Sequence, residues 1–68
     1  MDTKTARAIL SEVAAGGWLD KPMPESDEEL VEMAQYYAEE AQLSVNEGMK
    51  DEHLLAIVNL SKISPPVS

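Results

Sequence analysis

The chain has 68 residues, no cysteine and a formal charge of −8, from 13 acidic and 5 basic residues. A chain this short is expected to form one domain over residues 1–68. Without cysteine it has neither disulfides nor thiolate metal sites to stabilise so small a core. Binding to a partner protein or to a second copy is the remaining way to stabilise the fold. The negative charge argues against direct binding of nucleic acid or anionic membranes, both of which depend on lysine and arginine.

The first predicted helix covers residues 3–15. Its apolar residues recur at the spacing of one helix face, and Asp2 or Thr3 can cap its first turn. Gly16-Gly17 ends it, because glycine readily adopts the left-handed conformation found at helix C-termini. The expected buried stripe is Ala6, Ile9, Leu10, Val13 and Ala14.

A connector follows from Trp18 to Pro24, where Pro22 and Pro24 prevent a continuous helix. Trp18 has two interpretations at this stage. It either plugs the core across the helix ends, or it is an exposed binding anchor of the kind enriched at interface hot spots.

The second predicted helix covers residues 26–46 and has the clearest start. Ser26 followed by Glu29 has the spacing of a capping box. The expected buried stripe contains several small residues that would let a neighbouring helix approach closely. Its members are Leu30, Met33, Ala34, Tyr37, Ala38, Ala41 and Val45.

The third predicted helix covers residues 51–63, and Pro65-Pro66 leaves a short flexible tail at 64–68. Its apolar residues surround most of its circumference, which predicts burial on more than one side. The fold is therefore expected to be all-α: a hairpin of the second and third helices with the N-terminal helix packed across it.

The segment from Leu55 to Lys62, LAIVNLSK, resembles the C-terminal stretch of the theta subunit of bacterial DNA polymerase III and its phage-encoded relatives. Those are also small three-helix proteins. The resemblance covers eight residues, and that family is basic where this chain is acidic. No function is carried over from it.

The sequence predicts no enzyme, no metal site and no cofactor. It contains no glycine-rich phosphate loop and no histidine–carboxylate metal motif. Its single imidazole, His53, stands at a helix start, where an exposed polar residue is the ordinary interpretation. The polar N-terminus and short apolar runs predict a soluble, cytoplasmic protein without a signal peptide or a membrane span.

The second helix supplies the predicted partner-binding surface. From Pro22 to Met49 the chain has no lysine or arginine, and helix-start chemistry explains only the first acids of this stretch. Such a face either meets a basic protein surface or is merely solvated. Tyr36 likewise belongs to a second apolar strip or to a wide core stripe. The predicted binding residues are Glu28, Glu32, Met33, Tyr36, Glu39, Glu40 and Leu43.

The third helix supplies a predicted homodimer interface, because so short a chain has little with which to cover an apolar circumference. The expected interface residues are Leu55, Val58, Leu60 and Ile63.

Two functional hypotheses result. The first is a small acidic regulator or inhibitor that covers a basic surface of a partner protein, of the kind that otherwise holds nucleic acid. Phages and mobile elements commonly encode compact acidic helical proteins of this class, which disable a host enzyme or defence complex; this is an association of class. The alternative is a structural or assembly module that docks through the third helix. Salt dependence separates the two.

Overall fold

The computed structural model describes the backbone of residues 1–63 and the side chains of residues 1–62. It contains three helices, α1 (Thr3–Ala15), α2 (Asp27–Asn46) and α3 (Glu52–Ile63), and no strand within that range. The predicted all-α fold is confirmed. The predicted tail at 64–68 lies outside the described residues.

Local chemistry sets each helix start. The carboxylate of Asp2 accepts a hydrogen bond from the backbone N–H of Thr5 at 2.9 Å, and this contact holds the pKa of Asp2 below its usual value. The Ser26 hydroxyl accepts from the N–H of Glu29 at 3.2 Å, which is the serine half of the predicted capping box. Asp51 accepts from the N–H of His53 at 2.8 Å in front of α3. Each bond satisfies a first-turn donor that has no partner within its helix.

The helices α1 and α2 end in the same way. Gly17 and Gly48 have φ values of 83° and 100°, in the left-handed region that favours glycine. The N–H of Trp18 then bonds back to the carbonyl of Val13, and that of Met49 to the carbonyl of Ser44, each at 3.1 Å. This pairing is the Schellman motif, which turns the residue after the glycine back towards its own helix. Large apolar side chains therefore stand at both helix ends.

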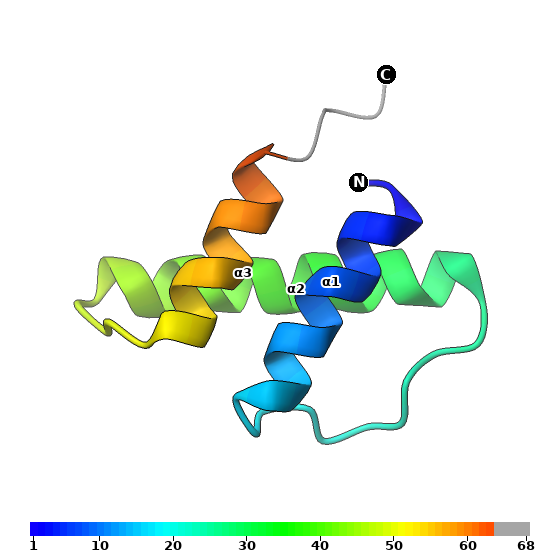
Figure 1. Ribbon diagram of the computed structural model, residues 1–68, viewed down its shortest axis with the longest axis horizontal. Coiled ribbons are helices and arrows are strands. Elements are labelled where there is room, and N and C mark those ends of the chain that lie inside the picture. Colours follow the sequence, from blue (N-terminus) through cyan, green and yellow to red (C-terminus); the bar gives the residue numbers. More distant parts are fainter. Residues whose placement is uncertain (64–68) are drawn as a thin grey trace.

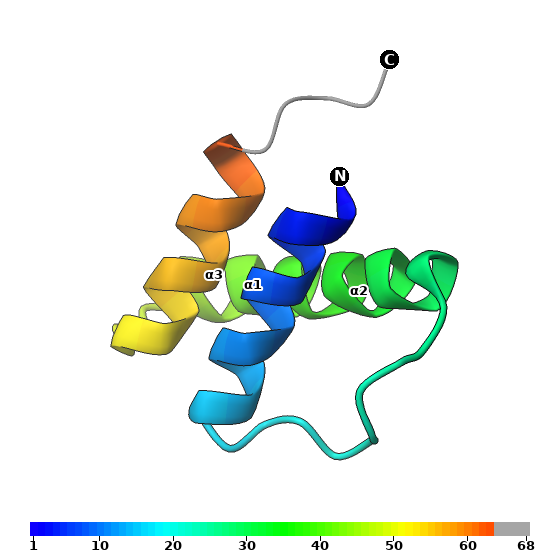
Figure 2. The same cartoon turned by 45° about the vertical axis from the view of Figure 1, so that its right-hand side comes forward.

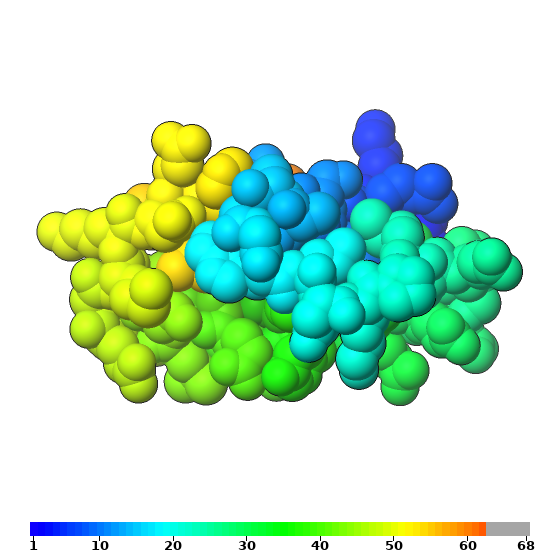
Figure 3. Space-filling model, turned by 90° about the horizontal axis from the view of Figure 1, so that it is seen from below, coloured from blue at the N-terminus to red at the C-terminus, as the bar shows by residue number. Residues whose placement is uncertain are grey.

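The helices form two layers. α1 and α3 lie side by side, run in opposite directions, and both cross α2 (Figures 1 and 2). The Cα positions extend over 32 × 28 × 14 Å, so the molecule is flat. Seen from below, α2 forms one layer, and the connector and the start of α3 lie over it (Figure 3).

This arrangement differs from the expected hairpin, because the antiparallel neighbours are α1 and α3. The small side chains of Ala34, Ala38 and Ala41 explain the difference. They leave room for two helices to cross one face of α2 at close range. The residues with least exposure come from all three helices: Ala6, Ile9, Leu10, Val13, Leu30, Ala34, Ala38, Ala41, Leu54, Ile57 and Val58.

Three further expectations can be compared with the core. Ala14 is exposed, so the buried stripe of α1 is narrower than predicted. Met33, Tyr37 and Val45 are only partly buried and pack against the core from its margin. The apolar circumference of α3 is explained within the chain, because α1 and α2 both pack against it.

Trp18 is neither a fully buried core plug nor a fully exposed anchor. Its six-membered ring covers Gly16, and the indole and the ring of His53 form a T-shaped pair with a centroid distance of 6.4 Å. The residue is 37% exposed. A Cβ atom at Gly16 would collide with the indole ring. The contact therefore requires glycine there for reasons of space, since the φ of Gly16 is an ordinary −78°.

We expect Gly16→Ala to displace the indole ring and change the emission of Trp18, the single tryptophan of the chain. Gly17→Ala is the matched control, because a Cβ there meets open space while the positive φ costs about 1–2 kcal/mol. It should lower the free energy of unfolding and leave the native emission unchanged. Equal native emission in the two variants would contradict the ring contact.

Candidate protein-binding surface

The packing leaves one side of α2 uncovered. Since α1 and α3 both contact the stripe around Ala34 and Ala38, the opposite side of α2 faces away from the rest of the chain. We call this side the outer face. The residues by which we define it are all exposed: Glu28, Glu32, Tyr36, Glu39, Glu40 and Leu43 of α2, and Glu47 directly after the helix.

Two large apolar side chains stand in the middle of the outer face. Tyr36 is 59% exposed and Leu43 is 58% exposed. Seven residues separate them, so they lie almost in line along the helix. Carboxylates flank this pair on both sides, at the three- and four-residue spacing of helix neighbours. Glu32, Glu39 and Glu40 adjoin Tyr36, and Glu39, Glu40 and Glu47 adjoin Leu43.

The carboxylates of α2 form no ion pair with a basic side chain within residues 1–62. Within residues 1–62, the ion pairs are those of His53 with Glu12 and with Glu52, and neither involves α2. The basic residues of the chain all stand outside this helix. The outer face therefore combines exposed apolar surface with uncompensated negative charge.

The structure brings together most of the predicted binding residues. Six of the seven lie on the outer face; the exception is Met33, which is partly buried against the core and belongs to the flank of α2. The three apolar residues of the predicted binding set are thus divided between two surfaces, with Met33 on the flank of α2 and Tyr36 and Leu43 on the outer face.

The predicted dimer residues are dispersed. Val58 is only 4% exposed and serves the core of the single chain, so its side chain is not available to a second copy. Leu60 is partly buried against the same core. Leu55, at 41% exposure, is the one that faces outwards, and the side chain of Ile63 lies outside the described residues.

A groove adjoins the outer face along the flank of α2. It consists of two concavities of about 460 and 220 Å³, and Trp18, Tyr36 and Tyr37 line both of them. We call it the aromatic groove. Tyr36 and Glu40 stand on the edge that it shares with the outer face.

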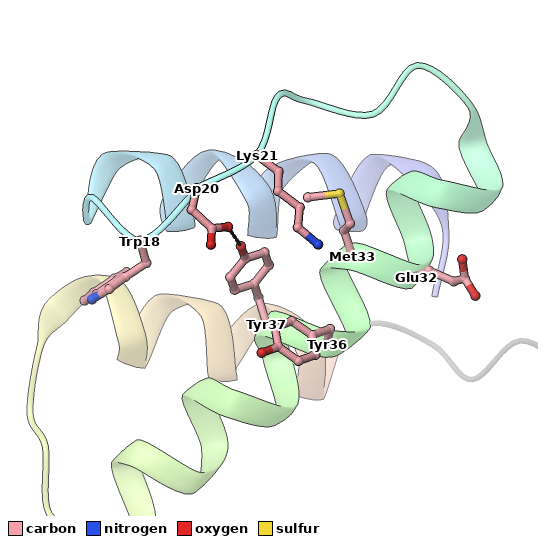
Figure 4. Close-up of a pocket in the computed structure, with 7 residues that line it drawn as sticks. All are labelled: Trp18, Asp20, Lys21, Glu32, Met33, Tyr36 and Tyr37. Atoms are coloured by element: carbon pink, nitrogen blue, oxygen red, sulfur yellow. Dashed lines mark hydrogen bonds between the residues drawn. The ribbon is translucent and has the colours of Figure 1, made fainter.

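The larger concavity lies between the connector and α2 (Figure 4). The Tyr37 hydroxyl donates a hydrogen bond to Asp20 at 3.1 Å, which ties the connector to the helix. Burial, and then the bond to Asp20, raise the pKa of Tyr37 and keep it a neutral donor. Lys21 reaches from the connector towards α2, whereas the carboxylate of Glu32 points away from Lys21 and the connector (Figure 4).

The smaller concavity lies between the C-terminal half of α2 and the ends of the other two helices. Trp18 and Met49, the residues that follow the two left-handed glycines, both line it. Its interior is formed by apolar residues of the core, and Glu40 and Ser44 are its polar members. Sequence reasoning did not assemble this groove. The available signal was the pair Gly17-Trp18 and Gly48-Met49, because the residue after such a glycine folds back on its helix.

No family model matches the chain, and no curated protein or solved structure matches it significantly. Within the described residues, no group of three or more histidine, aspartate or glutamate side chains is placed to hold a metal ion. None of the described helices combines the length and the apolar character needed to cross a membrane.

A histidine contact joins α1 to the start of α3 beside the groove. His53 Nδ1 lies 2.8 Å from a carboxylate oxygen of Glu12, and this hydrogen bond raises the pKa of His53 above its usual value, against a smaller opposing effect of desolvation. Folding thus strengthens proton binding by His53. The associated stability is complete below the unfolded pKa, near 6.5, and is lost as the pH rises through the folded pKa.

We expect the midpoint of thermal unfolding to fall as the pH rises from about 6 to about 8, across the range in which histidine titrates. Glu12→Gln removes the negative partner and is the matched control. Its midpoint should change less over the same range. Equal slopes for the two proteins would show that the His53–Glu12 contact does not contribute to folding stability.

Proposed function

We propose that the protein is a small regulator that binds a partner protein by covering a basic surface with the outer face of α2. The observation that carries the proposal is the exposed pair Tyr36 and Leu43 among carboxylates that have no ion-pair partner in residues 1–62. The proposal involves neither catalysis nor a cofactor.

The two kinds of side chain would contribute differently. Complementary charges accelerate association and select the partner, whereas buried aromatic and aliphatic anchors slow dissociation. A solvated helix needs exposed carboxylates but has no use for Tyr36 and Leu43 in their midst. Helix-start chemistry also fails to explain Glu39 and Glu40, which stand beyond the first turn of α2.

The experiment is affinity capture with the whole chain from an extract of its native host, at low and at high salt. The proposal predicts retained proteins with strongly basic surfaces, and release as the Debye length falls from about 10 Å at 0.1 M salt to about 3 Å at 1 M. Retention that is indifferent to salt would contradict the proposal and favour apolar docking.

The consequence for the partner follows from occlusion. A basic surface that binds nucleic acid would lose that ability once covered by carboxylates, so we propose an inhibitory role. A cytoplasmic location and an origin in a phage or mobile element belong to the same proposal, and they rest on the cysteine-free sequence and on the association of class.

A second candidate is an assembly module that docks through α3. The 41% exposure of Leu55 favours it, and the predicted homodimer rests on the same residue together with the uncovered part of Leu60. Leu55→Glu tests docking through α3 more directly than a substitution of Leu60 would, because Leu60 also packs against the core. Sedimentation of the parent as a single ~7 kDa species would exclude the dimer.

A further inference from the structure

We propose that the aromatic groove receives an arginine next to an apolar side chain, both supplied by the partner protein. This rests on the proposed function and specifies the chemistry that the partner presents. The groove and the outer face share Tyr36 and Glu40, so one partner can contact both surfaces.

The apolar half of the proposal follows from the smaller concavity. Val13, Ala41, Leu54 and Ile57 contribute to its lining, so the floor of the smaller concavity is apolar. Its volume of about 220 Å³ is below the ~300–1,000 Å³ of small-molecule sites. A single aliphatic or aromatic side chain suits such a space better than a cofactor does.

The arginine half follows from the aromatic rings and the carboxylates around them. A planar guanidinium stacks on aromatic faces and binds carboxylates with two parallel hydrogen bonds, which a lysine ammonium cannot do. Tyr36 and Glu40 supply a ring and a carboxylate on one edge of the groove. Asp20 adds negative charge along the larger concavity, where Lys21 is the one base in the lining.

Charge also decides against a second copy of this chain as the occupant. Each copy has a formal charge of −8, and the groove borders the uncompensated carboxylates of α2. Bringing two such surfaces together would set like charges against each other at short range. The same negative charge attracts a basic segment of a partner protein.

The test uses the whole protein and a displayed library of short random peptides as the probe. Selected peptides are synthesised, and their binding is titrated through the emission of Trp18, which lines both concavities. Three variants are compared with the parent. Ser44→Phe fills the smaller concavity without removing a carboxylate, Ser44→Ala is its matched control, and Tyr36→Ala removes the shared ring.

The expected peptides share an arginine beside a bulky apolar residue. Ser44→Phe and Tyr36→Ala should each weaken their binding at least about tenfold, and Ser44→Ala should not. Replacing the arginine by lysine should also weaken it. Peptides without arginine, the absence of any common sequence, or undiminished binding to Ser44→Phe would each overturn the proposal.

Two outcomes separate this inference from the proposed function. If Ser44→Phe captures the natural partner as the parent does, the groove is not used, while the role of the outer face stands. If the parent sediments as a dimer and Ser44→Phe as a monomer, a second copy occupies the groove and the inference is wrong.

Discussion

Exchanging both Glu39 and Glu40 for lysine is expected to abolish partner binding and to leave the fold intact. Both carboxylates are exposed, stand beyond the first turn of α2, and border the apolar pair Tyr36 and Leu43. Two lysines there would face the basic surface of the partner with like charge. Such juxtaposition in an interface costs several kcal/mol, enough to reduce the affinity by orders of magnitude.

The fold should tolerate the exchange because no hydrogen bond or ion pair within residues 1–62 uses either carboxylate. The midpoint of thermal unfolding should hold or rise slightly as repulsion along α2 decreases. Circular dichroism checks the fold, and calorimetric titration with the captured partner measures the loss of affinity.

A charge-matched control distinguishes the surface from the net charge. Glu25→Lys combined with Glu52→Lys changes the total charge equally, and both residues are exposed outside α2. It should slow association modestly and preserve the complex. If the Glu39/Glu40 variant binds as well as the parent, the outer face is only a solvated surface, and binding belongs to α3 or to the Trp18 connector.

The sequence predicted the helices well because their ends are decided locally. Ser26, Gly17 and Gly48 act on neighbours within four residues, so a linear reading contains all of the chemistry involved. The outer face of α2 was predictable for a related reason. Helical periodicity decides which residues lie opposite the Ala34–Ala38 stripe, whichever helix covers that stripe.

The sequence could not predict which helices are neighbours. A buried stripe requires a partner but does not identify it, so the expected pairing of the second and third helices rested on their short connection. The actual pairing of α1 with α3 involves contacts between residues far apart in the sequence, such as His53 with Glu12. The same reason explains Val58, which was expected at a dimer interface and lies in the core.

The aromatic groove shows most clearly what could not be predicted from the sequence. Trp18, Tyr37 and Met49 come from three separate segments, and only the crossing of the helices brings them to one surface. Helical periodicity describes each segment separately and does not indicate how the segments pack against one another. A groove formed between layers therefore leaves no regular trace in the sequence, apart from the glycines that turn Trp18 and Met49 back.

The same substitution at two leucines should separate folding from binding. Leu10 is fully buried at the centre of the core, and Leu43 is 58% exposed on the outer face. Leu10→Ala should cost about 2–5 kcal/mol of unfolding free energy, since it leaves a cavity among packed side chains. A domain of this size has only about 3–10 kcal/mol in total, at roughly 0.05–0.15 kcal/mol per residue, so the variant should be partly or largely unfolded at 37 °C.

Leu43→Ala removes the same atoms from a position that contacts solvent. Its unfolding free energy should stay within about 0.5 kcal/mol of the parent value, while its affinity for the partner falls by about 1–3 kcal/mol if Leu43 enters a desolvated contact. Urea unfolding measures the first quantity and calorimetric titration the second. A Leu43→Ala variant with parental affinity would show that Leu43 does not enter a desolvated contact with the partner. A Leu10→Ala variant as stable as the parent would contradict the two-layer core itself.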